Sequence, residues 1–211
     1  MIDQILKNLI WLGHDGFCLK AVNKTIYIDP FQISGDFEPA DIILVTHEHY
    51  DHCSPADIEK LVKADTIIIT DPMSARKLKG DIRIMRPGDN MLVEGIMVEA
   101  VPAYNTNKKF HPKANKWLGF VITVDGVKIY HAGDTDHIPE MKKLEVDIAL
   151  LPVSGTYVMT ANEAVQAALD INPKVAIPMH YGSLVGTPQD GPEFERVLSG
   201  KLRVELLKAK K

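Results

Sequence analysis

Residues Ile42–His52 have the sequence IILVTHEHYDH, and this stretch decides both the fold class and the chemistry to be expected of the chain. Its first four residues are apolar, which predicts a buried β-strand. Three histidines and an aspartate follow in the pattern H-x-H-x-D-H, and imidazole nitrogen and carboxylate oxygen are the ligands that Zn²⁺ and similar metals prefer. Because side chains alternate along an extended segment, His47 and His49 point to the same side and can share one metal ion.

The residues after the motif predict a helix over 55–63 that starts with a proline and has Ser54 as its N-cap. The bend from strand to helix separates Asp51 and His52 from the first pair of histidines. That separation suits a second metal ion about 3.5–4 Å from the first. We expect Cys53, directly after the motif, to be a buried thiol, because the imidazoles and carboxylates already supply enough ligands.

Three histidines rarely complete two metal sites, so further ligands must come from distant parts of the chain. Asp134 comes shortly after an apolar strand predicted over 127–131, and its two carboxylate oxygens can bridge two cations. His180 comes shortly after a strand predicted over 175–178. Polar residues at the ends of buried strands are where α/β proteins place their site groups. We therefore expect Asp134 and His180 to join the metal site.

The composition of the 211 residues is that of a soluble globular protein, with 45% hydrophobic and 25% charged residues. This length suits one domain, residues 1–211. The net charge of −4 offers no basic field for nucleic acid, and no apolar stretch is long enough to span a membrane. The first residues lack the apolar core of a signal peptide, so we expect a cytoplasmic protein that acts on a small molecule. The sequence leaves the oligomeric state open.

Short β-compatible runs separated by turn residues dominate the chain, and helical segments lie between some of them. The Glu-Gly dipeptide at 94–95 and the Asp-Gly dipeptide at 125–126 each join two such runs and predict hairpins. The predicted strands are 9–12, 17–21, 25–28, 42–46, 66–70, 82–85, 91–92, 96–101, 118–124, 127–131, 146–151, 175–178 and 202–206, and the other predicted helices are 72–78, 139–144, 161–169 and 192–198. This alternation predicts two mixed sheets covered by helices.

A faint internal repeat accompanies this pattern. The stretch 24–30 (KTIYIDP) resembles 128–134 (KIYHAGD), and in each a short strand delivers an aspartate, Asp29 or Asp134, at its end. The echo indicates that one half of the fold is repeated.

Three motifs in this order resemble the metallo-β-lactamase superfamily of metal-dependent hydrolases: H-x-H-x-D-H, Gly-Asp-Thr at 133–135 and Met-His-Tyr-Gly at 179–182. Trp-Leu-Gly-His at 11–14 and Ile-Asp-Pro at 28–30 resemble its small branch of bacterial and archaeal hydrolases near the ascorbate-6-phosphate lactonases. The resemblance spans nearly the whole chain. It implies an α/β (α+β) fold, a four-layer αββα sandwich of two mixed sheets flanked by helices, with the site at the sheet edges.

The resemblance also implies that six ligands hold two divalent ions. Those of the first ion are His47 and His49, those of the second are Asp51, His52 and His180, and Asp134 bridges the two. His14 and Asp29 would line the site, where groups that orient metal ligands are physically expected.

One position departs from the superfamily pattern. Members usually offer a third histidine to the first metal from a loop after a strand that ends near Pro-Ala, and here Asn105 stands about where that histidine should be. Asparagine is a poor zinc ligand. Either His111 in the polar loop 105–116 completes the site, or the first site is weakened, or Asn105 contacts substrate. For His111 three roles are open: metal ligand, substrate contact or general acid, and solvated loop residue.

These residues together predict a metal-dependent hydrolase with one or two divalent ions, zinc in the first place and manganese or iron as alternatives. A metal pair lowers the pKa of a bound water toward neutrality, and Asp51 can accept a hydrogen bond from that water. We expect a small ester, lactone or phosphodiester as substrate, anionic if Lys108, Lys109 and Lys113 contact it rather than only solvent. Two alternatives stay open, because fold does not fix function: a non-catalytic metal-binding domain and a mononuclear iron oxidoreductase.

Overall fold

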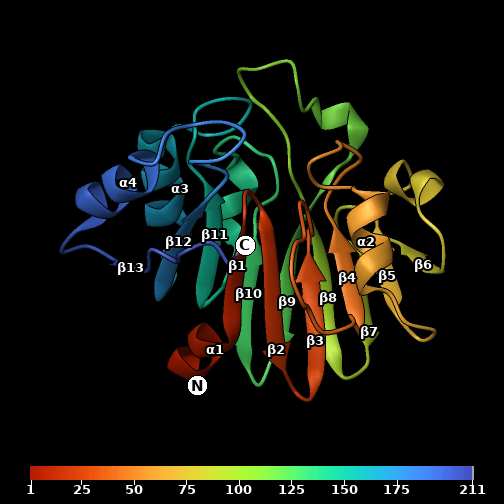
Figure 1. The fold of residues 1–211 in the computed structure, drawn as a ribbon. Helices are drawn as coiled ribbons and strands as arrows, with labels where there is room; N and C mark the ends of the chain where they lie inside the picture. The colour runs from red at the N-terminus through yellow and green to blue at the C-terminus, as the bar shows by residue number, and fades with distance from the viewer. Residues whose placement is uncertain (211) are drawn as a thin grey trace.

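Two mixed β-sheets face each other in the computed structural model, which describes residues 1–210 (Figure 1). The six-stranded sheet has the order β1 (Leu9–Gly13), β2 (Gly16–Ala21), β3 (Lys24–Ile28), β4 (Ile42–Val45), β5 (Ile67–Thr70) and β6 (Asp81–Ile84). The seven-stranded sheet has the order β13 (Arg203–Val204), β12 (Val175–Met179), β11 (Ile148–Pro152), β10 (Val127–His131), β9 (Leu118–Val124), β8 (Ile96–Pro102) and β7 (Asn90–Val93).

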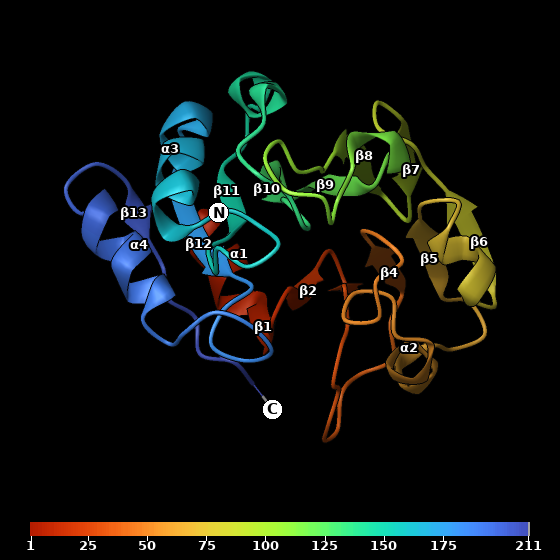
Figure 2. The same cartoon turned by 90° about the horizontal axis from the view of Figure 1, so that it is seen from above.

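Helices cover the outer sides of both sheets. The α-helices are α1 (Ile2–Asn8), α2 (Pro55–Leu61), α3 (Ala161–Ile171) and α4 (Asp190–Leu198), and the 3-10 helices are η1 (Ser74–Lys77), η2 (Lys113–Asn115) and η3 (Pro139–Lys143). Figure 2 shows α2 outside the six-stranded sheet, and α3 and α4 outside the seven-stranded sheet. The predicted αββα sandwich is therefore confirmed. None of the helices within residues 1–210 has the length and apolar character that crossing a membrane requires.

Both sheets change from antiparallel to parallel pairing at an equivalent strand. In the first sheet β1, β2 and β3 pair antiparallel, and β3 to β6 pair parallel. In the second sheet β7 to β10 pair antiparallel, and β10 to β13 pair parallel. Strands β3 and β10, which carry the sequence echo, thus occupy the same place in their sheets, as a repeated half-unit predicts.

Strand β4 shows why the sandwich needs apolar residues on both faces of a strand. All four of its residues are buried. Ile42 and Leu44 belong to the large core between the sheets, whereas Ile43 and Val45 belong to a smaller core that also contains Ile58 of α2. Burial on both faces explains the unbroken apolar run of the sequence.

The turn and cap signals of the sequence have the expected geometry. Glu94 and Asp125 both have positive φ, 51° and 49°, and each is followed by a glycine with positive φ, which is the backbone of a two-residue hairpin turn. The side chain of Ser54 accepts a hydrogen bond from the backbone of Asp57, so the predicted N-cap of α2 is confirmed. Helix α3 begins with a capping box between Thr160 and Glu163.

Three predicted elements differ in kind or clearly in length from those of the structure, and one helix was not predicted. Helix α1 had no prediction, because a seven-residue helix carries a weak periodic signal and is stabilised by packing rather than by propensity. The helices predicted over 72–78 and 139–144 are 3-10 turns of four and five residues. The last strand shortens from 202–206 to two residues, because it lies at the sheet edge and pairs on one side only.

Candidate metal centre

The candidate residues converge because strands of both sheets end at one edge of the sandwich. His14 follows β1, Asp29 follows β3, and His47 lies two residues after β4. From the second sheet, Asp134 lies three residues after β10, and His180 follows β12. Carboxyl ends of parallel strands meet at the same edge, so residues more than 100 positions apart reach one site.

A first ligand group contains His47, His49, His111 and Asp134, whose ligand atoms all lie within 4.8 Å of one another. His49 Nδ1 is 3.0 Å from His47 Nε2 and 3.2 Å from His111 Nε2. Asp134 Oδ2 is 3.1 Å from His111 Nε2. Three nitrogens and one oxygen at these distances match the donor set and number of a tetrahedral zinc site.

A second ligand group contains His14, His52 and His180, again within 4.8 Å of one another. The other oxygen of Asp134, Oδ1, lies 3.4 Å from His52 Nε2 and 3.3 Å from His180 Nε2. Asp134 therefore turns one oxygen to each group, as the predicted bridging role requires.

Asp51 lies beside the second group rather than inside it. Its Oδ2 is 3.1 Å from His14 Nε2 and 4.0 Å from His52 Nε2. Burial would raise the pKa of Asp51, but the hydrogen bond to His14 and the charge of His52 outweigh burial and lower it. The carboxylate is thus held in its charged, hydrogen-bond-accepting form.

Two buried atoms at the centre have no hydrogen-bond partner among the described residues: His52 Nε2 and Asp134 Oδ1. Buried polar groups are normally paired, so an imidazole nitrogen and a carboxylate oxygen that face each other without partners have the chemistry of metal ligands. Metal ligands of this kind are neutral imidazoles and ionised carboxylates. The residues present therefore fit a pair of divalent ions that share Asp134.

The pKa shifts follow from burying this cluster. Burial and the charge of His52 hold the pKa of His47 well below its usual range. Burial would lower the pKa of His52 as well, but Asp134 and Asp29 outweigh burial and hold it well above that range. Conversely, burial would raise the pKa of Asp134, and His180 and His52 hold it well below normal. The shifts of His52 and Asp134 thus share one cause, which is that their opposite charges face each other in a buried cluster.

Asp29 orients His52 directly and His47 through the hydroxyl of Thr46. His52 Nδ1 donates to Asp29 Oδ2 over 2.7 Å, which leaves Nε2 to face the site. The hydroxyl of Thr46 donates to the same oxygen over 2.6 Å and lies 3.0 Å from Nδ1 of His47. Carboxylate partners of this kind fix the tautomer and ring orientation of metal-ligating histidines.

Asn105 performs a similar task for His111. Its Oδ1 accepts from the backbone nitrogen of His111 over 2.9 Å and lies 3.2 Å from His111 Nδ1. Its Nδ2 donates to Asp136 and to the carbonyl of Tyr157. His111 is only 1% exposed, so the solvated-loop interpretation of this residue is wrong. The asparagine at the usual histidine position thus holds another histidine in the first group.

Three of the site residues have left-handed backbones that non-glycine residues rarely adopt: His14 (φ 51°), Asp29 (φ 43°) and His180 (φ 60°). Strained conformations of this kind cluster at functional sites, where the surrounding fold enforces them. Gly133, next to Asp134, also has a left-handed backbone (φ 60°), and a Cβ atom there would lie 2.7 Å from the carbonyl oxygen of Leu118.

The comparison with known proteins agrees with this geometry. The profile of the β-lactamase superfamily domain matches residues 8–180. This chain belongs to the β-lactamase superfamily. It also belongs to the UPF0173 family of metal-dependent hydrolases, since it is 32% identical over 214 residues to a member from Pyrococcus abyssi, covering 94% of this chain and 95% of that protein.

Two solved structures are also similar to this chain in fold and in sequence. A proposed metal-dependent hydrolase from Parabacteroides distasonis has a TM-score of 0.87 and 38% identity, covering 96% of this chain and 93% of that chain. A proposed zinc-dependent hydrolase of the superfamily from Thermotoga maritima has a TM-score of 0.66 and 26% identity, covering 94% and 97%. The superfamily expected from the motifs is confirmed, and the closer likeness to ascorbate-6-phosphate lactonases stays a prediction.

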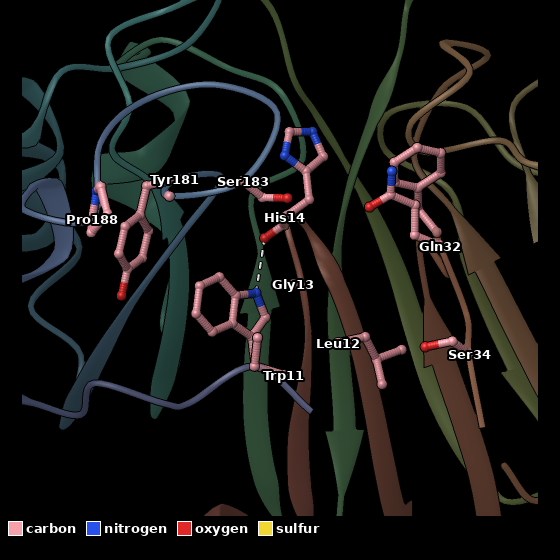
Figure 3. Close-up of a pocket in the computed structure, with 12 residues that line it drawn as sticks. Trp11, Leu12, Gly13, His14, Gln32, Ser34, Tyr181, Ser183 and Pro188 are labelled. Carbon is pink, nitrogen blue, oxygen red and sulfur yellow. Dashed lines mark hydrogen bonds between the residues drawn. The ribbon is translucent and has the colours of Figure 1, made fainter. Parts of the chain in front are cut away.

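A cavity of about 410 Å³ adjoins the second ligand group of this superfamily domain and shares His14 with it. Its walls include Trp11, Phe31 and Tyr181, and the rings of Trp11 and Tyr181 stack with centroids 5.2 Å apart. Figure 3 shows these two rings side by side and the His14 ring above them. Within residues 1–210, no lysine, arginine, aspartate or glutamate lines this cavity, so its chemistry is uncharged.

Sequence reasoning missed two residues of this domain's site. Asp15 is fully buried, its oxygens have no hydrogen-bond partner in the described chain, and Oδ2 lies 3.8 Å from His52 Nδ1. Burial raises the pKa of Asp15 well above its usual range. Trp117 packs its ring against His47 and His49, with centroids 4.9 Å and 4.8 Å away. The position of Asp15 directly after His14 could have indicated a place in the site. No neighbouring residue in the sequence does the same for Trp117.

Proposed function

We propose that the protein is a dinuclear zinc hydrolase that cleaves a small uncharged ester or lactone. The observation that carries the proposal is the pair of buried ligand groups that share the two oxygens of Asp134. Nitrogen-rich donor sets favour zinc over magnesium or calcium. The similarity to the Thermotoga maritima protein, a proposed zinc-dependent hydrolase, supports the same metal.

Asp51 and His111 then have separate roles in the proposed reaction. A bound metal pair supplies a nucleophilic water at neutral pH by lowering the pKa of that water. Asp51, charged and at the edge of the second group, is placed to accept a hydrogen bond from it. We assign His111 to the first ion rather than to acid catalysis, because its Nε2 faces Asp134 and its Nδ1 faces Asn105.

The substrate class follows from the charges around the centre. Of the three lysines that the sequence suggested as substrate contacts, Lys108 pairs with Asp136 at 2.7 Å and Lys113 pairs with Glu140 at 2.9 Å. The exposed Lys109 has no ion pair among the described residues. The adjoining cavity is uncharged and aromatic, and a few hundred Å³ suits a small ligand. This favours an ester or lactone over a phosphodiester, and a small molecule over nucleic acid.

The test is turnover on a matched panel. Protein stripped by chelation and reloaded with Zn²⁺ is assayed on neutral aryl esters, lactones and a phosphodiester of the same aryl alcohol. We expect hydrolysis of the neutral substrates, lost in Asp134→Asn and kept in Asp65→Asn, whose carboxylate is on the surface. Two bound zinc ions without turnover on any substrate would favour a non-catalytic metal-binding domain. Faster turnover of the phosphodiester would contradict the substrate class.

A further inference from the structure

We propose that a second cavity, beside Trp117, binds a small organic carboxylate, a ligand with an anionic head and an apolar body. This Trp117 cavity measures about 350 Å³ and shares no residue with the cavity that His14 lines. Its walls contain the cations Arg86, Lys113 and Lys116 and the aromatic rings of Tyr104 and Trp117, with two prolines and an alanine between them. None of these residues belongs to a ligand group found in the described chain.

The fold brings the cations of the Trp117 cavity together from two separate segments. The long loop between β8 and β9 closes at its base, where the backbone nitrogen of Ala103 donates to the carbonyl of Trp117 over 3.1 Å. Arg86 comes from the connection between β6 and β7. That connection is tied to β8, because the backbone nitrogen of Gly88 donates to the carbonyl of Ala100 over 2.8 Å. Backbone contacts therefore fix both segments around one cavity.

Two of the three cations are not neutralised. Lys113 pairs with Glu140 at 2.9 Å. Arg86 and Lys116 are exposed, and neither has an ion pair among residues 1–210. Asp89 contacts Arg86 through the backbone nitrogen, over 2.7 Å, rather than through the guanidinium. In a chain with a net charge of −4, two uncompensated cations at one cavity favour an anionic ligand, and a guanidinium matches the geometry of a carboxylate.

The rest of the Trp117 cavity is apolar and aromatic. Trp117 and Tyr104 are buried, and the prolines and the alanine add further apolar surface. Inorganic phosphate would leave this surface without a partner, whereas a carboxylate with an apolar body would remove it from water. Cleavage of an ester or lactone releases a ligand of this class, so the cavity suits a product of that reaction. This link to the product rests on the proposed function, and the cavity itself does not.

Trp117 belongs both to the cavity wall and to the surroundings of the first ligand group. The centroid of its ring lies 4.9 Å from that of His47, 4.8 Å from that of His49 and 5.4 Å from that of His111. Its Nε1 is buried and has no hydrogen-bond partner within the described chain, so packing alone holds the ring. A ligand in the cavity therefore contacts a ring that packs against three metal ligands, and the fluorescence of Trp117 reports its binding.

The experiment titrates benzoate into protein that carries Trp11→Phe, so that Trp117 is the one remaining tryptophan of the sequence. Benzamide, which is uncharged and of the same shape, and inorganic phosphate are the comparison ligands at constant ionic strength. The test variants are Arg86→Gln and Lys116→Gln. The matched control is Lys109→Gln, an exposed lysine of the same loop that does not line the cavity. Each protein is checked by circular dichroism and titrated both metal-free and loaded with Zn²⁺. Equilibrium dialysis with labelled benzoate repeats the measurement on protein that keeps Trp11.

We expect saturable binding of benzoate with and without zinc. Its Kd should rise about fivefold in Arg86→Gln and in Lys116→Gln and change less than about twofold in Lys109→Gln, which is the range for exposed charge pairs. Benzamide and phosphate should both bind more weakly than benzoate.

Three results would overturn the inference: no saturable binding, binding to the zinc-loaded protein alone, or a Kd that neither test variant changes more than the control does. The second would place the carboxylate on the metal, and the third would place it in another cavity. Benzamide or phosphate that binds as tightly as benzoate would contradict the ligand class. Zinc-dependent turnover is measured separately, so the binding site and the proposed function can fail independently.

Discussion

Replacing Asn105 with alanine should weaken the first metal site without touching a ligand. The side chain makes two contacts to His111, to its backbone nitrogen and to Nδ1, and two more to Asp136 and the carbonyl of Tyr157. A net hydrogen bond contributes about 1 kcal/mol. Losing the two contacts that hold His111 therefore removes about 2 kcal/mol from metal binding, which is roughly 30-fold in affinity.

The assay is a competition titration of Zn²⁺ with a chromophoric chelator, on the unmodified protein, on Asn105→Ala and on Asn107→Ala. Asn107 is an exposed asparagine of the same loop. Its side chain donates to Glu163 over 3.4 Å and accepts from Lys108 over 2.8 Å, but in the described chain it does not contact His111, so its loss should change the affinity less than about twofold. We expect one of the two dissociation constants of Asn105→Ala to rise. A folded Asn105→Ala protein with both zinc affinities unchanged would refute the role given to Asn105 in placing His111.

Three further outcomes follow from the same geometry. Gly133→Ala should destabilise the metal-free protein by at least about 1–2 kcal/mol in urea unfolding, because the left-handed backbone disfavours a side chain and Cβ would meet the carbonyl of Leu118; a smaller loss would contradict the close approach. Zinc affinity should fall as the pH is lowered, starting above pH 6.5, because the raised pKa of His52 makes protons compete with the metal; pH-independent titrations would refute this. Phe31→Ala should raise KM about tenfold for an aryl ester but not for a small acetate ester, because Phe31 lines the uncharged cavity; equal KM changes would place the aryl group elsewhere.

Much of the fold could be predicted because its signals are local. The buried run of β4 and the two hairpin turns, with Glu94 and Asp125 in left-handed backbones, each depend on residues adjacent in the chain. The 3-10 turns and α1 could not be assigned in the same way. Their form depends on how a short segment packs against the sheets, which no pattern of a few residues records.

The same distinction between local signals and long-range packing applies to the site. His47, His49 and His52 stand together in the sequence, so their chemistry is visible there. The sequence left the third histidine of the first group open, and the place of His111 in that group is visible only once the polar loop is folded, with Asn105 held by Asp136 and Tyr157.

His14 was expected to line the site, and the structure brings one of its ring nitrogens within 4.8 Å of ligand nitrogens of His52 and His180. That placement depends on a bulged, left-handed turn and on a backbone contact to His180, 166 positions away in the chain. Long-range contacts of this kind place side chains at the site, and no local sequence pattern records them.

The central claim is that Asp134 bridges two metal ions, and anomalous diffraction at the zinc edge from crystals grown with Zn²⁺ tests it most directly. We predict two peaks about 3.5–4 Å apart, one on each side of the Asp134 carboxylate. The first peak should lie among His47, His49 and His111, and the second beside His52 and His180. A single peak, or two peaks that do not share Asp134, would contradict the account.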